Sequence, residues 1–127
     1  MTEQVPIKII IVLQDQELDD ANLQEFTEIL CQQITEVDGV DQANLVAVET
    51  PPEGSRALGG FLLGILTAEV NPVNIKTLFI FLSDRLGGKT IKMSIEAPDG
   101  RKLNVEASSQ EEFEFAVQQA KNFIDKV

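Results

Sequence analysis

The run IKIIIVL, residues 7–13, is rich in β-branched side chains and is bounded by Pro6 and a polar stretch that begins at Gln14. Isoleucine and valine favour an extended backbone, and the run is too short to cross a membrane. It therefore predicts a buried central strand.

Downstream of this strand, Asp19 and Asp20 place carboxylates where the N-terminus of a helix prefers them. Apolar residues then follow at helical spacing as far as Gly39, which is expected to end the helix. These residues are Leu23, Phe26, Ile29, Leu30, Ile34 and Val37. The next segment, ANLVAVE (43–49), carries apolar side chains on both faces and predicts a second strand. This order predicts a right-handed parallel crossover.

The last third of the chain predicts a hairpin and a closing helix. TIKMSIEA (90–97) and KLNVEA (102–107) both alternate apolar with polar side chains, and Pro98-Asp99-Gly100-Arg101 between them is a turn sequence. A capping box, either Ser108 with Glu111 or Ser109 with Glu112, then opens the helix. Its apolar stripe is Phe113, Ala116, Val117, Ala120, Ile124 and Val127.

The middle of the chain is a long apolar block. TPPEGSR (50–56) is expected to be a loop, because it contains two prolines and a glycine. We expect one helix over 57–70 and a second one capped by Asn71-Pro72, which together form an apolar helical hairpin at about 57–86. The apolar side chains of this hairpin either belong to the core, form a face for a protein partner, or dock on a membrane surface. The net charge opposes membrane docking. The longest charge-free stretch, Ala57 to Ala68, is too short to span a membrane.

These elements predict a single domain over residues 1–127 of the α/β (α+β) class, with the order β-α-β-α-α-β-β-α. The expected sheet is mixed and has four strands. The first and last helices are expected to pack on at least one of its faces.

Charge and composition exclude several classes of function. The chain has 10 Lys and Arg against 21 Asp and Glu, a net charge of −11, which repels nucleic-acid phosphates and anionic lipids. It contains no His, which removes Ser-His triads, Cys-His dyads and His-ligated zinc. Cys31 is the single cysteine and is expected to be a buried structural thiol. With no internal disulfide and no secretory signal pattern, we expect a cytoplasmic protein.

Two motifs resemble ligand sites but lack their essential residues. The acidic stretch from Asp15 has Asp20 where a calcium loop needs glycine and Phe26 where it needs glutamate. Gly87-Gly88-Lys89-Thr90 resembles the end of a phosphate-binding loop, but Ser83 replaces its first glycine. We therefore expect no metal and no cofactor.

Ser55 and Arg56 end the Pro/Gly loop just before the apolar block. The simple interpretation is solvation, and the functional one is a grip on an anion or carboxylate, which arginine makes better than lysine. Phe61 and Leu62, on the helix expected to follow, are the accompanying candidate interaction residues.

The order of the motifs resembles one known family. The motifs are Pro52-Glu53-Gly54-Ser55-Arg56, Gly88-Lys89-Thr90-Ile91, Pro98-Asp99-Gly100-Arg101 with Leu103-Asn104-Val105, and Ser109-Gln110-Glu111-Glu112-Phe113. Over residues 18–126 the chain resembles the effector-associated constant component family of bacterial conflict systems. The resemblance implies no catalytic residue. It implies a non-catalytic adaptor with a protein partner, such as an effector, a peptidase or an NTPase-type component.

Two hypotheses of function remain open. One is this adaptor, with a homodimer as a further possibility for its exposed surfaces. The other is a small acidic ligand-binding domain or enzyme that uses an anion-binding loop at Ser55-Arg56.

Overall fold

Strand β1 (Ile7–Gln14) lies at the centre of the sheet, as its β-branched run predicts. The computed structural model describes residues 6–14, 17–47, 57–58, 61–86, 90–97 and 100–125. Ile7, Ile9, Ile11 and Leu13 are buried, whereas the residues between them point to the other side of the sheet. One face of β1 therefore belongs to the core and the other does not.

The sheet is antiparallel throughout the described residues. Its other strands are β2 (Val40–Ala47), β3 (Ala57–Leu58), β4 (Phe61–Val70), β5 (Thr90–Glu96) and β6 (Lys102–Ala107). The order is β2-β4-β1-β5-β6, and the two-residue β3 pairs with β4. The predicted mixed sheet of four strands is therefore wrong, because this path has five strands in antiparallel pairs.

The predicted parallel crossover passes through the first helix, α1 (Asp20–Thr35), and the structure adds the strand order that the sequence left open. Strands β1 and β2 are each antiparallel to β4, so they run parallel to each other with β4 between them. In the same way β4 and β5, joined by α2 (Ile75–Leu86), are parallel with β1 between them. Two interleaved split β-α-β units form the ferredoxin-like arrangement, extended here by β6 and α3 (Gln110–Asp125).

The expected apolar helical hairpin at 57–86 is replaced by a strand and a helix. Residues 61–70 form β4, in which Leu66, Ala68 and Val70 are buried and alternate with residues of intermediate exposure. Strands β1 and β2 pair with its two edges, and this pairing selects the extended backbone. A short apolar run does not by itself separate a strand from a buried helix.

The second half of that block behaves as predicted. Asn71 caps the 3-10 turn η1 (Pro72–Asn74), which leads into α2. The Asn71 side-chain oxygen accepts a hydrogen bond from the backbone N–H of Val73 at 3.0 Å. Because Pro72 lacks an N–H, it suits the first turn of a helix.

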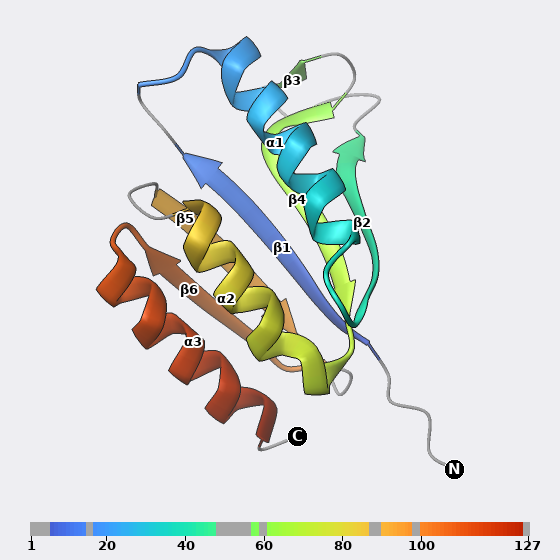
Figure 1. The fold of residues 1–127 in the computed structure, drawn as a ribbon, viewed down its shortest axis with the longest axis vertical. Coiled ribbons are helices and arrows are strands. Elements are labelled where there is room, and N and C mark those ends of the chain that lie inside the picture. The colour runs from blue at the N-terminus through green and yellow to red at the C-terminus, as the bar shows by residue number, and fades with distance from the viewer. Residues whose placement is uncertain are drawn as a thin grey trace.

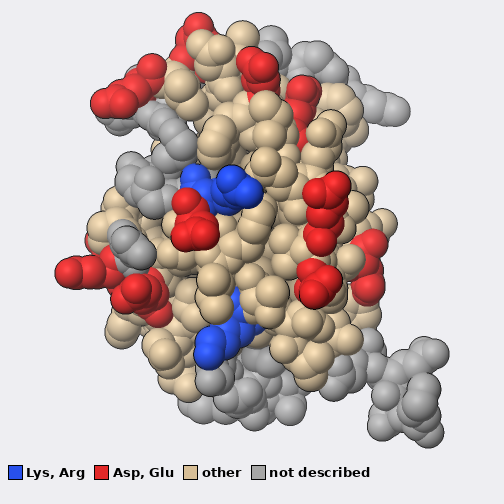
Figure 2. Space-filling view, viewed as in Figure 1, with Lys and Arg blue, Asp and Glu red and all other residues tan. Residues whose placement is uncertain are grey.

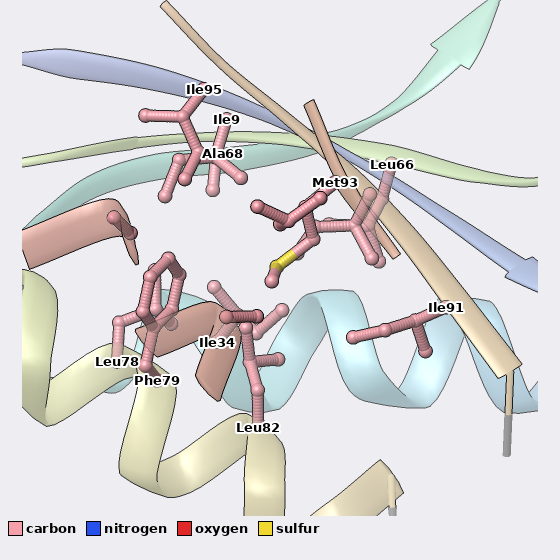
Figure 3. Packing of buried hydrophobic residues seen from close by; sticks show 14 of the residues in the cluster. Ile9, Ile34, Leu66, Ala68, Leu78, Phe79, Leu82, Ile91, Met93 and Ile95 are labelled. Atoms are coloured by element: carbon pink, nitrogen blue, oxygen red, sulfur yellow. The ribbon is translucent and has the colours of Figure 1, made fainter. Parts of the chain in front are cut away.

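All three α-helices lie on one face of the sheet, so the core is a single layer between them and the strands (Figure 1). Figure 3 shows Ile9, Leu66, Met93 and Ile95 from the sheet packed against side chains from the helices. The labelled helical residues are Ile34 of α1 and Leu78, Phe79 and Leu82 of α2. The expectation that the first and last helices cover one face is confirmed.

The predicted hairpin is also present, and so is the Ser109 half of the predicted capping box between Ser109 and Glu112. β5 and β6 pair from Ile91 with Ala107 to Glu96 with Lys102, and the N–H of Gly100 donates to the carbonyl of Ala97 at 2.9 Å. The hydroxyl oxygen of Ser109 accepts the backbone N–H of Glu112 at 3.2 Å, as a helix cap does.

Candidate interaction surface between α2 and α3

The structure places the sequence-predicted site residues differently from expectation. Ser55 and Arg56 lie outside the described residues, so the anion-binding loop stays a prediction. Phe61 and Leu62 begin strand β4, where they are half-buried and pair with Leu58 and Ala57 of β3. They belong to the sheet, and the helix expected over residues 57–70 does not form there. This difference follows from the strand pairing of β4.

Close to these residues, β4 bends at Gly64, whose φ is +72°. The pairing of β4 with β2 shifts in register at this end of the strand. The side-chain oxygen Oε1 of Gln24 accepts a hydrogen bond from the Gly64 N–H at 3.0 Å. Gln24 is 4% exposed, and its Nε2 has no hydrogen-bond partner within the described part of the chain. Helix α1 thus fixes the bend with a buried side chain.

The helical face carries a groove of about 590 Å³ between α2 and α3, which lie side by side (Figure 1). Phe79 and Phe113 lie deepest, because both are buried, and their rings meet edge to face with centroids 6.5 Å apart. The groove is lined by Phe79, Ile80, Ser83 and Asp84 of α2 and by Glu111, Phe113, Glu114, Phe115, Val117 and Gln118 of α3.

Two large apolar side chains of this groove are open to solvent. Ile80 is 58% exposed and Phe115 is 65% exposed. On α3 the stripe of Phe113, Ala116 and Ala120 is buried as predicted, and Phe115 lies outside it. Single exposed apolar residues are common on protein surfaces, but these two share one concave surface with an aromatic floor. That combination is typical of an interface.

The rim of the groove is acidic. Asp84 from α2 and Glu111 and Glu114 from α3 line it, and no lysine or arginine does among the described residues. The guanidinium of Arg85 instead lies 5.2 Å from the centroid of the Phe81 ring, a cation–π contact. Figure 2 shows acidic side chains over much of this helical face and basic ones in far fewer places.

The first turn of α3, which positions one side of the groove, is held by Glu112. Its Oε1 accepts hydrogen bonds from the backbone N–H and from the hydroxyl of Ser108, both at 2.9 Å. These bonds, first the backbone one and then the side-chain one, lower the pKa of Glu112. Its carboxylate therefore serves the helix cap while Glu111 and Glu114 line the groove.

The opposite face of the sheet has a different character. Its shallow hollow of about 370 Å³ includes Ile10, Val12 and Lys92 in its lining. Charged residues of opposite sign lie across from one another there, as Lys8 does between Glu69 of β4 and Glu96 of β5. Such cross-strand pairs are typical of a solvated antiparallel face and need no partner to explain them.

The described residues hold no cluster of metal ligands, and the single cysteine is buried. There, no group of three or more His, Cys, Asp or Glu is arranged to hold a metal ion. Cys31 is buried as predicted, and burial raises the pKa of its thiol. Among the same residues, none of the helices combines the length and apolar character needed to cross a membrane.

No family model, curated protein or solved structure matches this chain. The surface of the described residues is therefore the basis of the proposed function. Sequence reasoning missed the α2–α3 groove, although one signal for it was present: Phe115 interrupts the polar side of an otherwise regular amphipathic helix.

Proposed function

We propose that this protein is a non-catalytic adaptor that binds a protein partner through the groove between α2 and α3. The observation that carries the proposal is the exposure of Ile80 and Phe115 on one concave surface whose floor is the buried Phe79–Phe113 pair. Aromatic side chains near the centre of such a surface are the residues that most often dominate binding.

The energy available from covering these side chains is large enough to matter. Fully burying one such side chain contributes roughly 1.5–3 kcal/mol, and more than half of each is still exposed. Covering both therefore contributes about 2–4 kcal/mol before the costs of association are subtracted. That amount makes the pair an anchor, and polar contacts at the rim would supply specificity.

The resemblance to the effector-associated constant component family also supports an adaptor role. Its motifs include Pro98-Asp99-Gly100-Arg101 and Ser109-Gln110-Glu111-Glu112-Phe113, the latter in the cap and first turn of α3. The proposed role is to recruit or regulate an effector in a bacterial conflict system. The proposed partner is a peptidase or an NTPase-type component.

Capture of the partner from the source organism tests this proposal. Tagged wild-type protein is compared with Phe115→Ala and with the matched control Ile29→Ala, which truncates a 48% exposed side chain on α1, away from the groove. Far-UV circular dichroism checks that all three fold alike. Bound proteins are quantified by mass spectrometry.

We expect one near-stoichiometric partner that is lost with Phe115→Ala and retained with Ile29→Ala. If no partner is captured at stoichiometric amounts, or if both variants retain it equally, the adaptor role of this groove is wrong. A partner lost equally with both variants would place the binding surface elsewhere on the helical face and contradict the proposal as well.

A further inference from the structure

The chemistry of the groove defines what fits it. On α3, Glu111 and Glu114 are three residues apart and Phe115 follows, so the three side chains lie on neighbouring positions of one helical face. On α2, Asp84 lies one turn beyond Ile80. The α2 wall therefore combines one exposed apolar side chain with one carboxylate, and the α3 wall combines one exposed apolar side chain with two carboxylates.

Carboxylates beside an apolar trough select the charge of the occupant. A second copy of the chain, or an anionic membrane, would bring further negative charge against Asp84, Glu111 and Glu114, since the protein carries a net charge of −11. Like charges placed together across an interface oppose association and suppress wrong partners. A basic segment is favoured on the same grounds.

The shape of the groove selects the form of that segment. The groove is lined by residues 79–84 of α2 and 111–118 of α3, which form walls about 9 Å and 12 Å long. A trough of this kind accepts an amphipathic helix whose apolar residues recur at i, i+3 or i+4, and i+7. About two turns of helix would match the part of α3 that lines the groove.

We propose that the α2–α3 groove binds a basic amphipathic helix of the partner protein. Its apolar side chains cover Ile80 and Phe115, and its lysines or arginines lie beside Asp84, Glu111 and Glu114. The inference rests on the proposed adaptor function and adds to it the chemical class of the segment that is recognised.

The test uses three labelled synthetic peptides of equal length and the full-length protein. One has leucines at i, i+3, i+4 and i+7 with lysine and arginine on both flanks, and the second has glutamate at the flanking positions. The third has the composition of the first in scrambled order. Fluorescence anisotropy measures binding. We expect the basic amphipathic peptide to bind at least about tenfold more tightly than the other two, with affinity falling as salt is raised, because salt screens exposed charges.

Charge reversal tests whether the preference for the basic peptide arises at the groove. Glu111→Lys with Glu114→Lys is compared with Glu25→Lys with Glu28→Lys, an exposed pair on α1 that changes the net charge by the same amount. The groove variant is expected to bind the basic peptide at least about tenfold more weakly than the wild type does, and to bind the acidic peptide more tightly. The α1 variant is expected to change either affinity by less than about threefold.

Three results would overturn the assignment: equal binding of the basic and acidic peptides, equal binding of the scrambled peptide, or equal effects of the two charge reversals. A concentration-dependent dimer of the wild type that is lost with Phe115→Ala would assign the groove to a second copy instead. If a captured partner depends on Phe115 but the peptides do not discriminate, the adaptor proposal stands and the basic helix is wrong. If the peptides discriminate but no partner is captured, the adaptor proposal fails and the groove keeps its ligand class.

Discussion

Substitution of Gly64 by alanine tests whether the bend of β4 requires a glycine. The φ angle of Gly64 is +72°, a conformation that costs an L-residue about 1–2 kcal/mol. A Cβ at this position would also lie 2.9 Å from the carbonyl oxygen of Leu13, which belongs to the central strand and cannot move without disturbing its pairing. Both effects act on the folded state.

A matched control separates the cost of the close approach to Leu13 from the cost of the positive φ. Gly100 also has a positive φ, +92°, but a Cβ there meets nothing within 4 Å. Alanine at Gly100 is expected to cost about 1 kcal/mol, since the strain is partly offset by the reduced freedom of the unfolded chain. Alanine at Gly64 adds an overpacking cost of about 1–3 kcal/mol, giving about 2–4 kcal/mol in total.

The assay is urea denaturation followed by far-UV circular dichroism, because the chain contains neither Trp nor Tyr as a fluorescent reporter. The free energy of unfolding is compared for the wild type and the two alanine variants. A loss at Gly64 no larger than the loss at Gly100 would refute the argument that the approach of the Leu13 carbonyl requires glycine.

Glu112→Gln is expected to lower the urea midpoint near neutral pH and to lose this effect in acid. The pKa of Glu112 is lowered in the folded state by its hydrogen bonds from Ser108. The stabilisation that the carboxylate provides is therefore present above the unfolded pKa and disappears as the pH falls through the folded pKa. A difference in urea midpoint between the two proteins that grows toward acid would contradict this. The thiol of Cys31 is expected to react with iodoacetamide much more slowly in the folded protein than in urea, because burial restricts access and raises its pKa; equal rates would show that it is accessible. Phe79→Ala is expected to cost about 3–5 kcal/mol and Phe115→Ala within about 0.5 kcal/mol, because the first side chain is 1% exposed and the second 65%. Similar losses of unfolding free energy for the two would contradict the assignment of one to the core and the other to the surface.

The α2–α3 groove shows why a surface is harder to predict than an element. The helical stripe of α3 follows from the spacing of its own residues, which placed Phe113 in the core. The exposure of Phe115 is meaningful only beside Ile80, and that neighbour is supplied by the packing of another helix. The candidate residues Phe61 and Leu62 were misplaced for the same reason, since their partners lie on β3.

The sequence by itself determined the features that depend on neighbours a few residues away. It defined the central β-branched strand, the cap at Asn71, the hairpin turn between β5 and β6 and a serine cap at the start of α3, because these signals arise from local backbone preferences and short-range hydrogen bonds. Only the tertiary structure decided that residues 61–70 are a strand and that it lies between β1 and β2. An apolar run is compatible with either backbone form, and the choice is made by edge pairing with strands that are distant in the chain.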